Sequence, residues 1–291
     1  MSFQIDQNEL NDLIDACWAH HAWVKEFDKG NHPSVLPSIE MPILWFGNLK
    51  AYERSERRII TVGLNPSEME FRERDTEETK GGWSMRRFQK ANEIASIDRI
   101  GNESDLQHYR DALDDYFLNA SAKGKKGKTK TAFMRWFSNW NGILHSLDAS
   151  FDPEEMKNTA IHTDFCTPIA TTPNWGELTD ETAKKTIADS AANCGLWKGL
   201  VSVLQPDVIL TCIASSYVED IIGSLGLKVD DLHNLTESTC PRSPARKTLH
   251  AVGKLETTPV HLFAAPAGTP WRGWYKCQIE DFAKLIGKTV W

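Results

Sequence analysis

The sequence predicts an α/β protein with a central, mainly parallel four-stranded sheet flanked by helices. The first observation is a set of short apolar runs rich in β-branched residues, the pattern of strands that are buried on both faces. These runs are Arg58–Val62, Thr159–Asp164, Val208–Ile213 and Val260–Ala264. The second observation is that longer helical stretches alternate with the runs, which is typical of doubly wound domains with right-handed crossovers.

The helical stretches set the expected order of elements. They lie around residues 84–96, 105–119, 131–147, 181–204, 216–224 and 276–287. A further helix is expected from Glu9 to about Val24, followed by a proline-spaced stretch, so we interpret residues 1–57 as an N-terminal helical extension of one α/β domain, 58–291. Nearly a hundred residues separate the first two strands, far more than one helix requires. An insertion is therefore expected at about 68–150.

The composition is that of an ordinary globular protein and disfavours several classes. The 291 residues carry 33 Lys and Arg against 40 Asp and Glu, a net charge of −7. Apolar runs fall short of the roughly 18 residues of a membrane span, and the amino terminus does not resemble a signal peptide, so we expect a cytoplasmic protein. The six cysteines are widely scattered, and we expect neither a metal centre nor a cofactor.

The segments that follow the predicted strands are where a ligand is expected, because open parallel sheets bind ligands beyond the carboxyl ends of their strands. The first of them is Gly63-Leu64-Asn65-Pro66-Ser67. Glycine permits a bend or a close approach and proline fixes the turn, so Asn65 is expected to project from the strand end. The alternative is that Asn65 only caps the next segment.

Taken together, four motifs resemble those of the uracil-DNA glycosylase superfamily. Val62-Gly63-Leu64-Asn65-Pro66-Ser67 resembles the first motif in its G-x-N-P form, and His162-Thr163-Asp164-Phe165-Cys166-Thr167-Pro168 resembles the strand-end motif with the base-reading residue. Leu204-Gln205-Pro206-Asp207-Val208-Ile209-Leu210 is similar to a helix-to-strand approach of the family. Ala265-Pro266-Ala267 with Trp271-Arg272-Gly273-Trp274 resembles the His-Pro-Ser loop and its DNA-inserting segment. The resemblance covers about residues 58–287.

The resemblance implies a glycosidic-bond hydrolase that flips a nucleotide out of DNA. The reaction passes through an oxocarbenium-like sugar and needs a positioned water. Asn65 would hold that water, with the backbone of Gly63 and Pro66 shaping the turn and Ser67 beside the base. An amide is a poor base, so its contribution would be positioning rather than proton abstraction.

There are two departures from the family pattern, and the first is in the last loop. Ala265 replaces the histidine that would donate to the departing base, and Ala267 replaces the phosphate-binding serine. Arg272 or His261 substitutes for that histidine, or the leaving group is easier, or the protein is a weak or lapsed catalyst.

The second departure is Asp164, which stands where the family often has asparagine. An amide offers a donor and an acceptor, as uracil requires, whereas a carboxylate only accepts and suits the amino group of cytosine. Because excision of ordinary cytosine would damage the host, we expect a modified cytosine, for example in phage DNA. The alternatives are that Asp164 is a strand-end cap, or that Thr163 occupies the pocket.

An aromatic ring is expected to stack on the flipped base, and Phe71 is favoured over Trp83 and Phe88 because it shares the loop with Asn65. In the last loop, Trp271 is expected to fill the vacated stack and Arg272 to contact a phosphate, with Ala265 and Gly268 also at the DNA. The alternative is that Trp271 and Trp274 pack this loop onto the domain.

Charge distribution favours DNA more than the net charge does. Residues 121–135 carry six cationic and no acidic side chains, and residues 239–254 carry four and none. Candidate phosphate contacts there are Lys125, Lys126, Lys128, Lys130 and Arg246. Solvated loops are the alternative, and the run Glu68–Glu78, with six acids, is unexpected beside DNA. We expect His20 and His21 on a helix surface and His162 in strand packing.

The sequence thus predicts a monofunctional, monomeric DNA glycosylase that removes a modified pyrimidine and leaves an abasic site for a nuclease. No lysine stands at a predicted strand end, which disfavours a Schiff-base lyase step. The alternatives are a conventional uracil-DNA glycosylase and a catalytically lapsed binder of modified DNA.

Overall fold

The chain forms two compact units. The first consists of Met1–Leu49, Leu64–Met134 and His162–Leu204, and the second of Lys50–Gly63, Arg135–Ile161 and Gln205–Trp291. The predicted extension, 1–57, and the predicted insertion, 68–150, each contribute residues to both units. The structure is a computed structural model that describes residues 3–30, 33–37, 40–71, 100–118, 121–123, 129–131, 136–225, 233–234, 249–265, 269–271 and 274–291.

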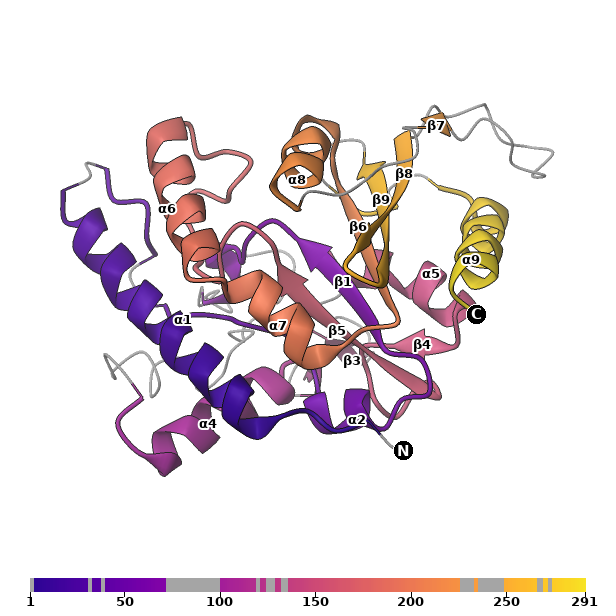
Figure 1. Ribbon diagram of the computed structural model, residues 1–291, viewed down its shortest axis with the longest axis horizontal. Helices are drawn as coiled ribbons and strands as arrows, with labels where there is room; N and C mark the ends of the chain where they lie inside the picture. The colour runs from indigo at the N-terminus through magenta and orange to yellow at the C-terminus, as the bar shows by residue number, and fades with distance from the viewer. Residues whose placement is uncertain are drawn as a thin grey trace. The chain divides into compact units, whose positions relative to one another are not determined.

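A mainly parallel sheet forms the centre of the second unit (Figure 1). In spatial order its described strands are β4 (Ala149–Ser150), β5 (Asn158–Asp164), β1 (Ile59–Gly63), β6 (Val208–Ala214), β9 (Thr258–Ala265), β8 (Leu249–Leu255) and β7 (His233–Asn234). β4 pairs with β5, β1 with β6 and β6 with β9 in parallel, whereas β8 and β7 are antiparallel to their neighbours. The last three residues of β5, 162–164, belong to the first unit.

The α/β class and a mainly parallel sheet flanked by helices are confirmed, and the four predicted strands correspond to β1, β5, β6 and β9. The predicted number of four strands was too small. β8 was not predicted; it joins β9 through a tight turn at Glu256 and Thr257. Glu256 has a φ of 54°, and this turn lacks the Asn-Gly or Asp-Gly pair by which a hairpin is recognised in a sequence.

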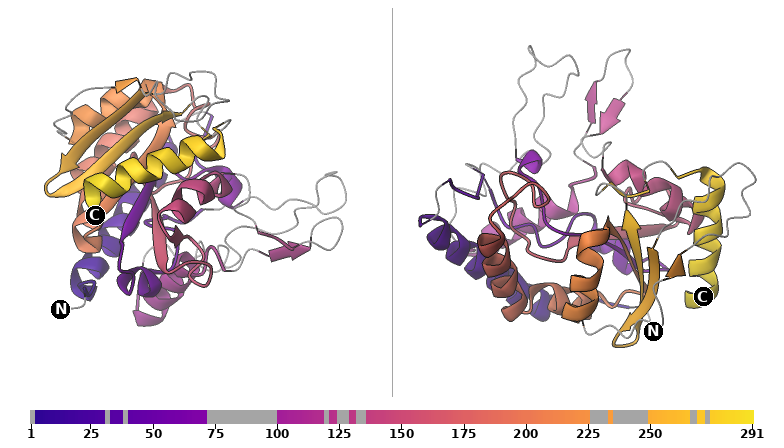
Figure 2. Two further views of the ribbon diagram at one scale, coloured as in Figure 1. Left: turned by 90° about the vertical axis from the view of Figure 1, so that its right-hand side faces the viewer. Right: turned by 90° about the horizontal axis from the view of Figure 1, so that it is seen from above.

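Helices cover both sides of the β8–β9 end of this sheet. In the right-hand view of Figure 2, α8 (Val218–Leu225) and α9 (Lys276–Val290) lie on opposite sides of these strands. Phe282 of α9 packs on Phe263 of β9 with ring centroids 5.2 Å apart, and α9 also contacts α5 (Asn141–Ser146). The remaining short elements are α2 (Leu49–Glu53), η2 (Phe137–Asn139) and η3 (Ser215–Tyr217).

Helices predominate in the first unit. They are α1 (Gln7–Asp28), η1 (Glu68–Glu70), α4 (Glu103–Asp114), α6 (Glu181–Asn193) and α7 (Leu196–Leu204), with an antiparallel hairpin of β2 (Ser121–Lys123) and β3 (Thr129–Thr131). The N-cap side chains Asp6, Asn102 and Asp180 accept backbone N–H bonds at the first turns of α1, α4 and α6.

Several helix predictions needed correction. The helix expected over 181–204 is two helices, because Gly195 has a φ of 66° and ends α6. The helix expected over 131–147 is reduced to η2 and α5 in the described residues. The helix expected at 84–96 lies outside the described residues.

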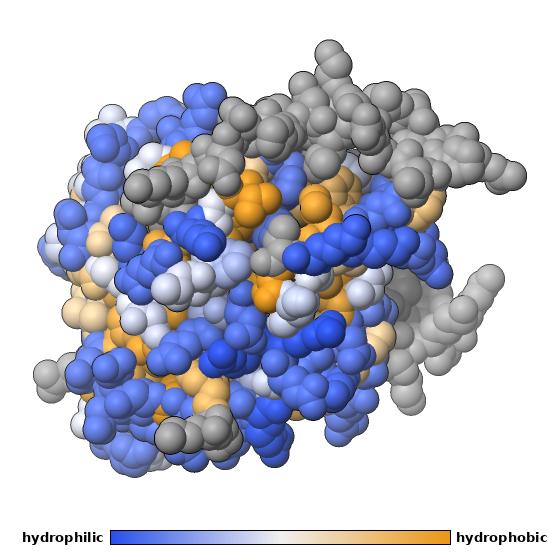
Figure 3. Space-filling view, turned by 45° about the vertical axis from the view of Figure 1, so that its right-hand side comes forward, coloured by the Kyte–Doolittle hydropathy of each residue, from blue (hydrophilic) through white to orange (hydrophobic). Residues whose placement is uncertain are grey.

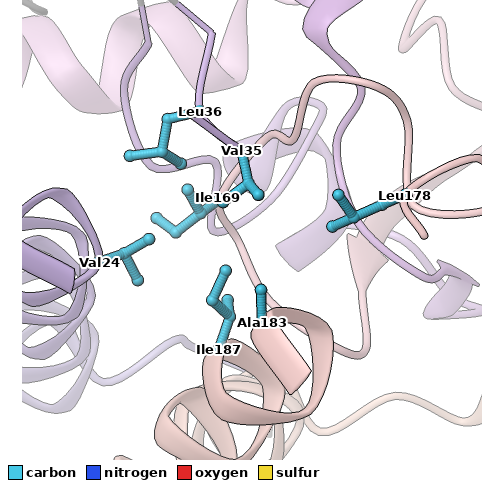
Figure 4. Close-up of a cluster of buried hydrophobic side chains, with 7 residues drawn as sticks. All are labelled: Val24, Val35, Leu36, Ile169, Leu178, Ala183 and Ile187. Carbon is cyan, nitrogen blue, oxygen red and sulfur yellow. The ribbon is translucent and has the colours of Figure 1, made fainter. Parts of the chain in front are cut away.

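A hydrophobic cluster joins α1 and α6 to the non-helical segments that contain Val35, Leu36, Ile169 and Leu178 (Figure 4). Ile169, in the segment that follows β5, points into this cluster and is fully buried. The members are Val24, Val35, Leu36, Ile169, Leu178, Ala183 and Ile187. Burial of a side chain such as Ile169 contributes about 2 kcal/mol, so the cluster fixes the path of the chain at this position.

The described surface is mixed in character. On the face drawn in Figure 3, hydrophilic residues surround small hydrophobic areas. Large hydrophobic side chains that are clearly exposed, among the described residues, are Trp23, Leu118, Tyr275 and Trp291. Within the described chain no helix combines the length and the apolar character needed to cross a membrane.

Asp114 connects α4 to Trp45 and to the first residue of α2, and its burial makes the stability of the protein depend on pH. Its Oδ1 accepts from Trp45 Nε1 at 3.0 Å and from Leu49 N at 3.3 Å. Burial raises the pKa of Asp114 from 3.8 to about 6. The folded protein therefore binds this proton more tightly than the unfolded chain does, and the free energy of unfolding falls as pH rises between these two pKa values.

We expect Asp114→Asn to stabilise the protein near neutral pH, by about 2–3 kcal/mol. The amide keeps an oxygen acceptor for Trp45 and Leu49 and removes the buried charge. The advantage should disappear at a pH below both pKa values, where Asp114 is protonated in either state. Urea unfolding over a pH series measures this, with the exposed Asp15→Asn as control; an Asp114→Asn effect that is the same at every pH would contradict the account.

Candidate functional site

The structure brings together the turn that follows β1 and the segment that follows β5. Cys166 N donates to Leu64 O at 2.7 Å, and Ser67 forms a parallel bridge with Thr171. Gly63 is the buried last residue of β1, and Pro66 is buried two residues after Leu64. Within the first unit, Leu64–Ser67 therefore runs beside the segment that follows β5, and we take these two segments as the candidate site.

Asn65 lies at the centre of this arrangement and is held through its side-chain amide. Its Nδ2 donates to Thr171 Oγ1 at 3.0 Å and to Ile169 O at 3.3 Å. Both Thr171 and Ile169 are fully buried. The two donors of the Asn65 amide are therefore both occupied by groups that the fold fixes.

These contacts also determine which way the amide faces. A peptide carbonyl such as Ile169 O has no proton to give, so the atom of Asn65 beside it must be the nitrogen. The oxygen, Oδ1, therefore points away from Ile169. None of the described residues donates to Oδ1, and Asn65 is only half-buried. The site thus presents one oriented hydrogen-bond acceptor at the end of β1.

The residues that hold Asn65 were missed in the sequence, because they lie beyond the motif that ends at Pro168. Thr167 starts this holding segment: its Oγ1 accepts from Ile169 N at 3.2 Å. The segment is also tied to the N-terminal part of the chain, since Ile43 N donates to Pro168 O at 2.7 Å and Thr172 N to Val35 O at 2.8 Å. The sequence feature that could have indicated this segment is its group of threonines at 167, 171 and 172, whose hydroxyls can form hydrogen bonds with neighbouring groups.

The start of the acidic run has a structural explanation. Glu68 accepts a hydrogen bond from the Thr172 hydroxyl. Glu70 is buried, and its Oε2 accepts from the Tyr116 hydroxyl at 2.6 Å. These two carboxylates fix η1, which follows Ser67 directly. The rest of the run, from residue 72 on, lies outside the described residues.

Asp164 and Thr163 have different surroundings at the end of β5. Asp164 is buried, and its Oδ1 is 3.6 Å from His162 Nε2, too far for a hydrogen bond. Thr163 is fully buried, and its Oγ1 accepts from Trp197 Nε1 at 3.0 Å. The hydroxyl of Thr163 thus has a partner within the core, which disfavours the alternative that Thr163 contacts a ligand, whereas the role of Asp164 stays a prediction.

Aromatic rings surround this region. Phe46 packs edge-on against Tyr116 with centroids 4.8 Å apart, and tilted against His162 at 5.5 Å. Phe71, the ring expected to stack on a base, is buried in the first unit. Its role as a stacking residue remains a prediction. The alternatives Trp83 and Phe88 lie outside the described residues.

The last loop of the predicted site belongs to the second unit. Trp271 has a φ of 53° and is buried, with Trp140, Phe263 and Trp274 around its ring. This is the packing arrangement given as the alternative to a DNA wedge, and a wedge role would require the ring to leave these partners. Ala265 ends β9.

Of the two residues suggested to replace the histidine of the family pattern, the structure describes only His261. His261 is fully buried, and its Nδ1 lies 3.2 Å from His250 Nε2. Burial lowers the pKa of His261 to about 4. A neutral, enclosed imidazole cannot donate to a base in this conformation. Arg272 and Gly268 lie outside the described residues.

The predicted phosphate contacts are also placed only in part. Lys130 is in β3 of the hairpin. The others, Lys125, Lys126, Lys128 and Arg246, lie outside the described residues. Within the part of the chain that the structure describes, no group of three or more His, Cys, Asp or Glu side chains could hold a metal ion.

Comparisons of the chain with protein-family models, curated proteins and solved structures gave no match. A functional assignment therefore depends on the motifs and on the geometry around Asn65 and Asp164.

We expect Thr163→Val to lower the free energy of unfolding by about 1–3 kcal/mol, because it leaves the buried Trp197 Nε1 without an acceptor. The exposed Thr179→Val is the matched control. Denaturant unfolding of both variants measures the difference. An unfolding free energy for Thr163→Val equal to that of the wild type would show that this hydroxyl is not a structural acceptor, and would return Thr163 to the candidates for ligand contact.

Proposed function

We propose that this protein is a monofunctional DNA glycosylase of the uracil-DNA glycosylase type, which excises a modified cytosine and leaves an abasic site. The observation that carries the proposal is the orientation of Asn65. Its amide donors are bound to Ile169 O and Thr171 Oγ1, so its oxygen is the group offered to a ligand or a water. A fixed acceptor at a strand end is what a positioned attacking water requires.

In the proposed reaction Asn65 only positions the attacking water. As the bond between C1′ and the base breaks, its electron pair leaves with the base and the sugar becomes oxocarbenium-like. The water held by Asn65 Oδ1 adds to C1′, and its released proton ends on the departing base or in solvent. Asn65 orients the water and removes no proton, because an amide is not a base at neutral pH.

Asp164 is proposed to read the base. Its carboxylate is at the end of β5, in the segment that lies beside the Asn65 turn. A carboxylate only accepts hydrogen bonds, so it matches the exocyclic amino group of cytosine and not the carbonyl of uracil. This match favours a cytosine, and because excision of ordinary cytosine would damage the host, the proposed base is a modified cytosine, for example in phage DNA.

A catalytically lapsed DNA binder is the second candidate. One observation favours it: Ala265 stands where the family has a leaving-group donor, and His261 is enclosed in the core. Lys130 and the cationic residues near it would then serve binding alone.

The test uses single-stranded and duplex oligonucleotides that carry cytosine, 5-methylcytosine, 5-hydroxymethylcytosine, glucosylated hydroxymethylcytosine or uracil. Abasic sites are revealed by alkali, and binding is measured by fluorescence anisotropy. We expect cleavage at a modified cytosine. Binding without abasic sites would establish the lapsed binder, cleavage at uracil alone would establish a conventional uracil-DNA glycosylase, and neither binding nor cleavage would refute both proposals.

We expect Asn65→Ala to slow abasic-site formation by about 10²-fold with little change in DNA binding, because it removes the group that positions the water. Asp164→Asn should shift the preference from cytosine bases toward uracil, since an amide both donates and accepts. The exposed Asn8→Ala serves as control. An Asn65→Ala variant as active as the control would show that the motif is misassigned.

A further inference from the structure

His20 of α1 is a buried residue, contrary to its expected place on a helix surface. Its Nε2 is 3.2 Å from Thr167 Oγ1, and its Nδ1 is 3.3 Å from Ser190 Oγ on α6. Burial, with a smaller effect of the neighbouring His21, lowers the pKa of His20 to about 4. The imidazole is therefore neutral at physiological pH, and each ring nitrogen has a hydroxyl partner that can donate or accept as the tautomer requires.

Thr167 connects His20 to the candidate site. The same Oγ1 that faces His20 accepts from Ile169 N, and Ile169 O accepts from Asn65 Nδ2. The backbone N–H of Ile169 is thus linked to His20 through Thr167, and the carbonyl of the same residue contacts Asn65. Its side chain is meanwhile fixed in the α1–α6 cluster (Figure 4). Every contact in this series lies within the first unit.

We propose that His20 is a positioning residue for Asn65, acting through the hydroxyl of Thr167 and the backbone of Ile169. His20 limits where Thr167 Oγ1 can lie, Thr167 Oγ1 limits the peptide of Ile169, and the carbonyl of Ile169 sets the direction of Asn65 Oδ1. The N-terminal helix is on this account part of the site. The catalytic consequence rests on the proposed glycosylase function, whereas the effect on the Asn65 side chain does not.

Two substitutions separate the two contacts of His20. Glutamine can place a side-chain amide near the position of Nε2, and so can keep the contact with Thr167. Asparagine is shorter and places its amide near the position of Nδ1, and so can keep only the contact with Ser190. The proposal therefore requires His20→Gln, but not His20→Asn, to restore the function of the site.

The first readout needs no activity. In protein labelled with ¹⁵N-asparagine, the side-chain amide of Asn65 is identified by its loss in Asn65→Ala. We expect His20→Ala and Thr167→Val to speed hydrogen exchange of that amide by about tenfold, the equivalent of one weakened hydrogen bond. His20→Gln should approach the wild-type rate, and His20→Asn should resemble His20→Ala. The exposed His108→Ala is the control.

The second readout uses the substrate found with the oligonucleotide panel. We expect His20→Ala to lower the single-turnover rate of abasic-site formation by about tenfold at unchanged DNA affinity, because misplaced water slows chemistry rather than binding. His20→Gln should recover this rate. Unfolding measurements on each variant confine the comparison to folded protein, and Thr167→Val, which leaves His20 in place, covers the case in which His20→Ala does not fold.

The outcomes are distinguishable. Wild-type exchange of the Asn65 amide in His20→Ala and Thr167→Val would overturn the proposal and leave His20 as a packing residue. Equal exchange in His20→Gln and His20→Asn would also overturn it. Faster exchange with an unchanged single-turnover rate would overturn the catalytic part alone. If the wild-type protein forms no abasic sites, the proposed function fails, while the exchange data still decide whether His20 positions Asn65.

Discussion

The candidate site depends on the burial of one side chain, Ile169. Its position in the cluster between α1 and α6 fixes a stretch of chain that follows β5 and has no regular secondary structure. The carbonyl of that residue then orients Asn65, and the amide N–H is held by Thr167. Hydrophobic burial has no preferred direction. It nevertheless orients hydrogen bonds here, because once the side chain of Ile169 is fixed, the directions of its backbone N–H and C=O are fixed as well. Packing between two helices of the first unit, α1 and α6, thus fixes the direction of the Asn65 side chain in the turn that follows β1.

The fold was accessible from the sequence where its signals are local. Apolar runs identified β1, β5, β6 and β9, because buried parallel strands have few polar residues. β8 was missed since its pairing with β9 through Glu256 carries no local turn signal. The break at Gly195 was missed because glycine within an apolar helical pattern does not by itself show that a helix ends.

The candidate site was predicted in part. The motifs located Asn65 and Asp164 because their residue types follow strand ends directly. Thr171 and His20 were not found, since each acts across more than 100 residues of chain, and no periodicity records such a contact. Glu70 was counted as part of a charged run, whereas its carboxylate is buried against Tyr116. Sequence composition cannot distinguish a solvated acid from one that accepts a hydrogen bond in a core.

The contact between Asn65 and Ile169 O also restricts which residues this position tolerates. Aspartate is nearly identical in shape to asparagine, yet it would place a carboxylate oxygen against the carbonyl oxygen of Ile169, with no proton between them. The repulsion would either turn the side chain away from the position that Asn65 occupies or raise the pKa of the acid so that it stays protonated, and in both cases no ionised carboxylate would stand at that position to act as a base. Substitution of Asn65 by aspartate alone would therefore not convert a water-positioning residue into a proton-abstracting one. The carbonyl of Ile169 would also have to move, which requires at least one further substitution.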